Sequence, residues 1–325
     1  MSRAIPSITP NPRVARSLGI AFTGVSILTA CQAVGSGESR QERTVQADLS
    51  AYRIVDLSHA FNEETIYWPT ATSFFELDVL SHGLSEGGWF YAANALSTPE
   101  HGGTHLDAPI HFAEGRPDAA SVPLDRLVAP AVVLDVVDAA AADPDYLLQP
   151  SDIEAFEARN GRIAAGSIVL LRTGWSERWP DVASYLGDDT PGDASNLHFP
   201  SYGEEAARVL VEDRGVAALG ADVASIDYGA SADFLVHRLA GAADVPGFEN
   251  LTNLSELPPT GAIVIALPMK IERGSGGPLR AIAWCQGHDG AHQGSHGRHV
   301  GGVGRLLARG ARGRHRVRVG NRRRR

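Results

Sequence analysis

The sequence predicts an α/β fold, a single domain built on a mixed and largely buried sheet. Five short apolar runs have the length of buried strands, and helical patterns lie between some of them. The segment that carries these elements, residues 51–286, is long enough to bury one substantial core. The sequence shows no internal repeat and no glycine-rich phosphate motif after a strand, so we expect no nucleotide site.

The expected strands cover residues 52–57, 131–137, 167–171, 216–219 and 262–267. Two capping boxes predict helix starts. Ser151 with Glu154 opens a helix through residue 158, and Ser201 with Glu204 opens another through residue 211. Strands that alternate with helices in this way favour a sheet whose pairing is partly parallel.

The first thirty residues have the pattern of a secretory signal peptide. Arginines precede an apolar run from Leu18 to Ala30, which is too short to span a bilayer comfortably. The end of this run, Leu28-Thr-Ala-Cys31, resembles a lipobox, in which cleavage before the cysteine is followed by its acylation. We therefore expect an exported lipoprotein, anchored to a membrane through acylated Cys31 and facing the periplasm or the cell exterior. An export signal with an incidental cysteine is the alternative.

Two segments beside the predicted domain have little to bury. Residues 31–50 are rich in glycine, serine, glutamine and charge, which predicts a flexible tether. Residues 287–325 contain eleven arginines and one acid, which gives this segment a formal charge of +10. Because the whole chain carries a formal charge of −9, the remaining residues together carry −19. We interpret 287–325 as a disordered tail and expect no nucleic-acid partner, although a basic tail that binds nucleic acid or anionic lipid is the alternative. The chain has two cysteines, and we expect no disulfide between Cys31 and Cys285.

The stretch from His101 to Phe112 holds three histidines and one aspartate at His-x3-His-x-Asp-x3-His spacing. A helix is disfavoured here by paired glycines and by Pro109. In an extended chain, the side chains at positions 101, 105, 107 and 111 would all point to one side. His101 and His105 would then lie about 13 Å apart, too far to share an ion with bonds of ~2.1 Å. The chain must therefore fold back between them, and Gly102-Gly103 supplies the freedom to do so.

Two imidazoles and a carboxylate suit Zn, Mn or Fe(II) better than Ca or Mg. Ligation by His101, His105 and Asp107 would leave coordination positions open for water, which is the catalytic rather than the structural arrangement. His111 lies four residues further on, beyond Pro109, so we assign it to proton transfer or to the groups around the ligands. A histidine packed for its ring alone is a poor explanation for four such residues together.

The pattern His101-x-Gly-Thr-His105-x-Asp107-x-Pro-x-His111-Phe is similar to the signature of the cyclase family of metal-dependent hydrolases, which contains bacterial kynurenine formamidase and isatin hydrolase. The likeness runs from about Tyr52 to about Cys285. Later blocks of the family are resembled by Ser225-Ile-Asp227, His237-Arg238, Glu249 to Leu254, Ala266 to Lys270 and Pro278 to Ala281.

This resemblance implies a swivelling β/β/α fold and metal ligation by His101, His105 and Asp107, with His111 as the catalytic acid/base. It also implies that His237 and Glu249 bind a second ion in two-metal members, with Asp107 and Glu249 reaching both ions. Trp68, in Tyr67-Trp68-Pro69, resembles the family's substrate-contacting tryptophan. Formamidases commonly continue with Gly-Asp, whereas this chain has Thr70-Ala71, which leaves the substrate open. Trp89, Phe90 and Tyr91 could also contact a substrate, but we expect them in the core.

We therefore predict a hydrolase that uses one or two ions of Zn or Mn to cleave the amide C–N bond of an aryl formamide or a cyclic aryl amide, such as N-formylkynurenine or isatin. We further expect a homo-oligomer, a dimer. Two alternatives stay open: a non-haem Fe(II) oxygenase, because two histidines and a carboxylate form its facial triad, and a non-catalytic lipoprotein that binds metal or solute.

Overall fold

The computed structural model of this protein describes residues 52–286. The predicted signal peptide (1–30), acylated Cys31, tether (31–50) and tail (287–325) lie outside the described residues and stay predictions. Within the described part, no helix combines the length and the apolar character needed to cross a bilayer.

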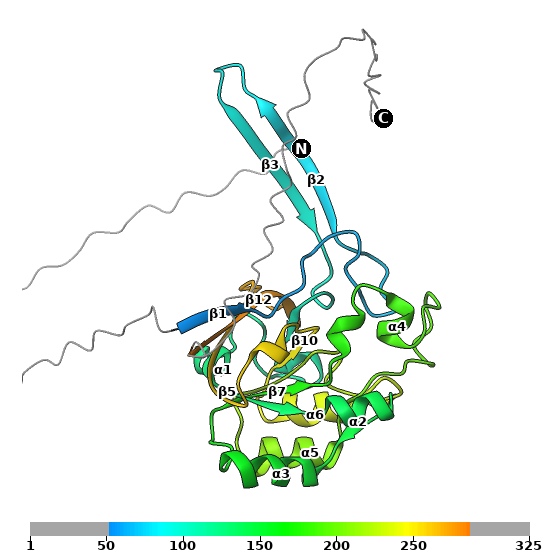
Figure 1. Ribbon diagram of the computed structural model, residues 1–325. Helices are drawn as coiled ribbons and strands as arrows, with labels where there is room; N and C mark the ends of the chain where they lie inside the picture. Colours follow the sequence, from blue (N-terminus) through cyan, green and yellow to red (C-terminus); the bar gives the residue numbers. More distant parts are fainter. Residues whose placement is uncertain (1–51, 287–325) are drawn as a thin grey trace, which may run out of the picture. The chain divides into compact units, whose positions relative to one another are not determined.

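Eight strands form one mixed sheet, and seven of them close into a ring (Figure 1). Closure occurs at β12, because its residues 276–278 pair with β4 while its residues 282–286 pair with the edge strand β1. Neighbours along β5, β7, β9 and β10 are parallel, and the other pairings are antiparallel. In sheet order the strands are β1 (Tyr52–Asp56), β12 (Gly276–Gln286), β11 (Thr260–Pro268), β5 (Val128–Asp135), β7 (Ile168–Arg172), β9 (Ala218–Ala221), β10 (Gly247–Glu249) and β4 (His105–Asp107).

The core has two parts, one on each face of the central strands. Along β7, Ile168 and Leu170 pack with Ala218, Val264 and other residues of the barrel interior, whereas Val169 and Leu171 pack with residues of the helices. A strand covered on both faces reads as a continuous apolar run, and this is why β5 and β7 could be recognised from the sequence. All five predicted strands are present, with ends that differ by at most three residues.

Four helices lie together on one side of β5 and β7 (Figure 1). They are α2 (Val137–Ala142), α3 (Pro150–Asn160), α5 (Glu204–Arg208) and α6 (Leu235–Ala242); α5 continues into a π-helical turn, η4 (Val209–Asp213). The shorter helices are α1 (Leu124–Leu127) and α4 (Val182–Leu186), with 3-10 turns at Pro109–His111, Trp175–Arg178 and Leu254–Glu256.

The two predicted helix starts need correction. The first helix begins at Pro150, one residue before Ser151, and Asp152 rather than Glu154 accepts the hydrogen bond of the capping residue, from the backbone N–H of Gln149. The second begins at Glu204, because Ser201 belongs to β8 (Ser201–Tyr202), which pairs with β6 (Leu147–Leu148). The Ser201 hydroxyl donates to the carbonyl of Ser225, and no side-chain hydrogen bond caps the helix that begins at Glu204.

A hairpin that the sequence did not predict follows β1. Its strands β2 (Glu76–Leu84) and β3 (Phe90–Ser97) pair only with each other, and no residue in either strand is buried. Figure 1 shows the hairpin extending away from the sheet. The expectation that Trp89, Phe90 and Tyr91 belong to the core is wrong, because all three are more than half exposed at the end of this hairpin.

Candidate metal centre

Two glycines in left-handed conformations reverse the chain between the first two histidines. Gly102 has φ +146° and Gly103 has φ +56°. A Cβ atom on Gly102 would lie 2.0 Å from the ring of Tyr67, so a larger residue does not fit there. The turn brings the ring centroids of His101 and His105 to 5.4 Å, less than half of the separation expected for an extended chain.

Asp107 lies at the centre of the cluster that this turn creates. Its Oδ1 is 2.6 Å from Nδ1 of His101 and 3.2 Å from Nε2 of His105. Its Oδ2 is 2.8 Å from Nε2 of His237, which is located on α6, 130 residues away in the sequence. Asp107 and His105 are almost fully buried.

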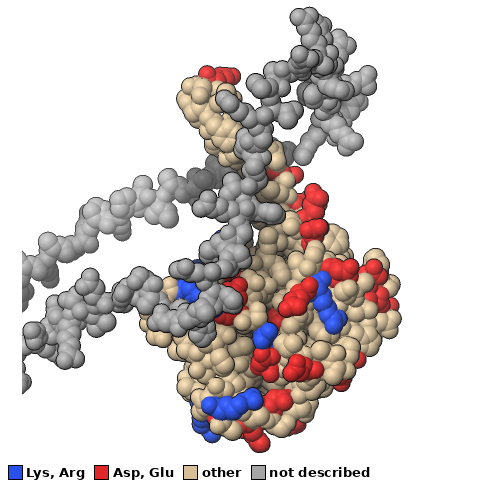
Figure 2. Space-filling view, viewed as in Figure 1, with Lys and Arg blue, Asp and Glu red and all other residues tan. Residues whose placement is uncertain are grey.

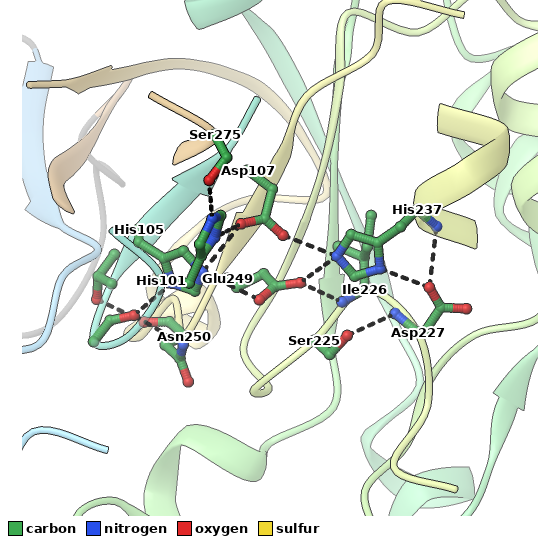
Figure 3. Close-up of polar contacts among 12 residues, drawn as sticks. His101, His105, Asp107, Ser225, Ile226, Asp227, His237, Glu249, Asn250 and Ser275 are labelled. Atoms are coloured by element: carbon green, nitrogen blue, oxygen red, sulfur yellow. Dashed lines mark hydrogen bonds and ion pairs between the residues drawn. The ribbon is translucent and has the colours of Figure 1, made fainter. Parts of the chain in front are cut away.

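Glu249 reaches the same cluster through strand pairing. β10 and β4 are antiparallel with Glu249 opposite His105, which places the two side chains next to each other. The Glu249 carboxylate lies 3.4 Å from Nε2 of His105 and 3.1 Å from Nε2 of His237. It also accepts a 2.9 Å hydrogen bond from the backbone N–H of Ile226 (Figure 3). The structure thus brings together His101, His105, Asp107, His237 and Glu249.

The outer hydrogen bonds of the histidines fix which ring nitrogens face the carboxylates. Nδ1 of His105 lies 2.9 Å from the carbonyl of Gly103, and Nδ1 of His237 lies 2.6 Å from the carboxylate of Asp227. Both partners can only accept, so each Nδ1 donates and each Nε2 presents a lone pair to the cluster. Sequence reasoning missed the part that Asp227 plays, although this residue lies in one of the segments that resemble the family.

His101 is oriented in the same sense. Its Nε2 lies 2.8 Å from the hydroxyl of Ser275, which in turn donates to Glu100 at 2.7 Å. Because the Ser275 proton goes to Glu100, the hydroxyl accepts from His101, and Nδ1 of His101 presents its lone pair to Asp107. When the three imidazoles are neutral, three lone pairs therefore face two carboxylates at 2.6–3.4 Å with no donor between them.

The pKa values of His105, His237 and Glu249 are all raised, as expected where hydrogen-bond acceptors outnumber donors. Burial lowers the pKa of His105, but Asp107, Glu249 and the hydrogen bond to Gly103 together outweigh burial and raise the pKa to about 9. The pKa of His237 is raised in the same way, against the effect of burial, by Asp107, Asp227 and Glu249. Burial and the charge of Asp107 raise the pKa of Glu249. The cluster therefore requires positive charge between its carboxylates, and a divalent cation supplies it better than protons do.

The donor set of imidazoles and carboxylates fits a divalent metal ion. No lysine or arginine is among the described residues that line this cavity, so no side chain of the site takes the place of a cation. The ligand atoms form two overlapping groups, each with its members within 4.8 Å of one another and both containing Asp107. One group is His101, Asp107 and His111, and the other is His105, Asp107 and Glu249.

His111 follows β4 in a short 3-10 turn and stacks on His101 with ring centroids 3.9 Å apart. Burial lowers its pKa to about 4, so the ring is neutral at neutral pH and can accept a proton. The spacing argument placed His111 apart from the ligands. In the structure, a ring nitrogen of His111 lies within 4.8 Å of possible ligand atoms of both His101 and Asp107, so the three could bind the same ion. His111 also lines the cavity.

The cavity beside the cluster has a volume of about 250 Å³ and a mainly apolar wall. Trp68 lines it, with its ring 6.2 Å from that of Phe234, and Phe112 lies 5.0 Å from Phe234 on the same wall. Phe234 has φ +52°, a left-handed conformation that is unusual for an aromatic residue, at the residue before α6. Sequence reasoning singled out Trp68. It assigned no role to Phe112, although this residue directly follows His111 in the motif, and it missed Phe234, which no spacing connects to the motif.

A mixed barrel that holds buried imidazoles and carboxylates beside an aromatic cavity defines a metal-dependent hydrolase. Comparison with known proteins agrees. The family model "Putative cyclase" matches residues 55–228. Isatin hydrolase of Roseibium aggregatum is 39% identical over 213 residues, which cover 62% of this chain and 79% of the relative. Kynurenine formamidase of Salinibacter ruber is 28% identical over 232 residues, which cover 70% of this chain and 96% of the relative.

Solved structures give the same result. Isatin hydrolase A from Labrenzia aggregata, bound to benzyl benzoate, superimposes with a TM-score of 0.67 at 33% identity, covering 73% of this chain and 95% of that one. The chain therefore belongs to the cyclase family. The predicted fold class and the prediction of a metal-dependent hydrolase are confirmed.

Proposed function

We propose that the protein hydrolyses the amide C–N bond of a small aryl amide, with a cyclic amide such as isatin preferred over an aryl formamide such as N-formylkynurenine. The observation that carries this proposal is the aromatic cavity that opens onto the cluster of His101, Asp107 and Glu249. A planar ring can pack against Trp68 and Phe234 while its carbonyl points at the cluster. The higher identity to an isatin hydrolase than to kynurenine formamidases supports the preference.

A divalent cation in this cluster would polarise the substrate carbonyl and make a bound water nucleophilic at neutral pH. The cation would be held by His101, His105, Asp107, His237 and Glu249, as Zn or Mn and as one or two ions. His111 removes a proton from the attacking water and delivers it to the leaving nitrogen as the C–N bond breaks. Asp227 and Gly103 keep the rings of His237 and His105 oriented throughout.

Three further features belong to the proposal and rest on the sequence alone. They are export, acylation of Cys31 with membrane contact on the periplasmic or outer side, and a homodimer. A Cys31→Ser substitution should move the protein from the membrane fraction to the soluble fraction without changing the metal content of residues 52–286. The domain boundaries at residues 30, 50 and 286 are proposed on the same sequence basis.

The test of the activity is a side-by-side assay. Protein loaded with Zn or with Mn should hydrolyse isatin with a higher kcat/KM than N-formylkynurenine, without oxygen uptake, and should lose activity when the metal is removed by a chelator. Hydrolysis of neither compound by folded, metal-loaded protein would refute the proposed substrates. Oxygen consumption during turnover would instead indicate the Fe(II) oxygenase, and metal binding without any turnover would indicate the non-catalytic lipoprotein.

A further inference from the structure

His101 differs from the other two histidines of the cluster in the group that binds its outer ring nitrogen. The outer nitrogens of His105 and His237 lie beside a backbone carbonyl and a carboxylate, which can only accept a hydrogen bond. The outer nitrogen of His101, Nε2, lies 2.8 Å from the hydroxyl of Ser275, and a hydroxyl can donate as well as accept. Ser275 alone therefore does not determine which nitrogen of His101 carries the proton.

The contacts of Glu100 decide the direction of the Ser275 hydroxyl. Oε2 of Glu100 accepts a 2.7 Å hydrogen bond from this hydroxyl and a 2.8 Å hydrogen bond from the backbone N–H of the same serine. Because the single hydroxyl proton points to Glu100, the hydroxyl offers only its lone pairs to His101. Nε2 of His101 then carries the proton of the neutral ring, and Nδ1 presents its lone pair 2.6 Å from Oδ1 of Asp107.

The backbone on either side of Ser275 allows these close contacts. Ser275 directly precedes β12, and this end of β12 pairs with β4, so the serine lies beside the histidine motif. A Cβ atom on Gly276 would lie 2.6 Å from the ring of His101, and one on Gly274 would lie 2.9 Å from the carboxylate of Glu100. With glycine at both positions, the imidazole and the carboxylate can both reach the hydroxyl. Figure 3 shows this hydroxyl beside the His101 ring.

Acidic side chains are common on this domain, so a nearby carboxylate means little by itself. Figure 2 shows many of them on the face of the molecule that it presents. Glu100 is distinguished by its contacts, because it is half-buried and makes two hydrogen bonds to one residue, Ser275. Glu272 lies in the loop that leads to Ser275 but is exposed, so it provides a matched comparison.

We propose that Glu100 and Ser275 act together as positioning residues, which hold His101 in the tautomer that can bind a metal ion through Nδ1. This inference rests on the proposed role of His101 as a ligand. Without Glu100, the Ser275 hydroxyl is free to donate to Nε2, and the proton of the neutral ring then moves to Nδ1. That N–H donates to Asp107 and occupies the lone pair that would bind the metal. A metal ion must displace this hydrogen bond, so its affinity falls.

Two simpler roles for Glu100 can be separated from this one by substitution. Glu100 would merely anchor the loop if only its bond from the backbone N–H of Ser275 mattered, and Ser275→Ala keeps that N–H while it removes the hydroxyl. Glu100 would act through its charge if the carboxylate only attracted the metal. Glu100→Gln removes the charge but not the acceptor, because one oxygen, Oε2, accepts both hydrogen bonds and the amide oxygen of glutamine can replace it.

The test measures the Kd of Zn²⁺ for each variant of the full chain by competition with a chromophoric chelator. Glu100→Ala and Ser275→Ala should each weaken binding by about 10- to 100-fold. The double variant should lose no more affinity than the weaker of the two single variants, because residues that act through one chain of hydrogen bonds are not additive. Glu100→Gln should restore most of the affinity that Glu100→Ala loses. The control Glu272→Ala should bind Zn²⁺ as tightly as wild type.

Circular dichroism of the metal-free proteins checks that each variant is folded, and Ser275→Ala alone carries the test if Glu100→Ala does not fold. The proposal is overturned if Glu100→Ala or Ser275→Ala binds Zn²⁺ as tightly as Glu272→Ala. Losses that multiply in the double variant overturn it, and so does a Glu100→Gln protein that binds as weakly as Glu100→Ala. If Asp107→Ala retains wild-type affinity, the proposed metal centre itself fails. No substrate is present, so these results do not depend on the proposed reaction.

Discussion

The side-chain amide of Asn250 donates a 2.8 Å hydrogen bond to the carbonyl of Gly103, the same oxygen that lies 2.9 Å from Nδ1 of His105. Asn250 directly follows Glu249, so the end of β10 supplies one cluster residue and also fixes the turn that orients another. The hydroxyl of Tyr185 donates to Oδ1 of Asn250 at 3.0 Å and holds the amide in this orientation. Asn250 thus acts as a positioning residue for His105.

Asn250→Ala should weaken metal binding by roughly 10- to 100-fold, which is the usual cost of removing a group that orients a ligand. Competition with a chromophoric chelator measures this change. Asn253→Ala is a matched control, because both asparagines are left-handed, with φ +54° and +57°, and both donate to a backbone carbonyl, but Asn253 binds Asp56 outside the cluster. Equal metal affinities in the two variants would contradict the positioning role.

The carboxylate of Asp227 accepts from Nδ1 of His237 and from the backbone N–H groups of Val236 and His237. Asp227→Asn replaces one accepting oxygen with a donor, so one of these three N–H groups loses its acceptor and the tautomer of His237 is no longer enforced. We expect metal affinity to fall by about 10- to 100-fold.

The control for Asp227 is Asp222→Asn. Asp222 is equally buried, but its carboxylate binds Thr173 and Gly174 and no residue of the cluster. This variant should lose stability and retain its metal affinity, as measured by thermal unfolding and by chelator competition. A similar loss of metal in both variants would mean that any buried aspartate substitution disturbs the site.

The part of the site that could be predicted from spacing is the part that is local in the sequence. His101, His105 and Asp107 are close along the chain, and the need for a reversal at the glycines follows from bond lengths alone. His237 and Glu249 approach through α6 and through the register of β10 with β4, which no single-sequence pattern reveals. Only the family resemblance pointed to them.

The fold was predictable to a similar degree and for a similar reason. Strands buried on both faces, such as β5 and β7, stand out as apolar runs. The hairpin of β2 and β3 was missed because Phe90 and Tyr91 were interpreted as core residues, and exposed apolar side chains cannot be distinguished from buried ones by composition. The prediction that Ser201 caps a helix was wrong because Ser201 belongs to β8 and contacts Ser225, and no local sequence pattern reveals these tertiary contacts.

His101→Ala and His111→Ala should separate metal binding from proton transfer. His101 points its Nδ1 at Asp107 at 2.6 Å, so its loss should remove both bound metal and activity. His111→Ala should retain metal and lose about 10²-fold or more in kcat, which is typical of a missing general acid or base. Metal analysis of the purified proteins and steady-state rates at saturating metal give the two readouts. If His111→Ala also loses its metal, His111 is a ligand, as its distance from His101 and Asp107 permits.

Glu157 and Arg214 form the most buried arginine–carboxylate pair of the described chain, with contacts of 2.7 and 2.9 Å, and they join α3 to the end of η4. Glu157 also accepts from the backbone N–H of Ile163. The hydrogen bond from Arg214 is the main reason that the pKa of Glu157 lies below its ordinary value. A lowered carboxyl pKa stabilises the fold above the pKa of the unfolded chain, and this contribution is lost as the pH falls through the folded value.

Glu157→Gln should therefore lower the free energy of unfolding by about 1 kcal/mol at pH 7, in line with well-formed ion pairs near a surface. The difference from wild type should shrink as the pH falls through about 4.5, where the Glu157 carboxyl of the unfolded chain is half protonated. Urea denaturation at several pH values between 7 and 4 measures it. Glu154→Gln, exposed on the same helix, should change stability little at any of these pH values. A difference between Glu157→Gln and wild type that stays constant across the range would show that the pair acts through packing rather than through its charge.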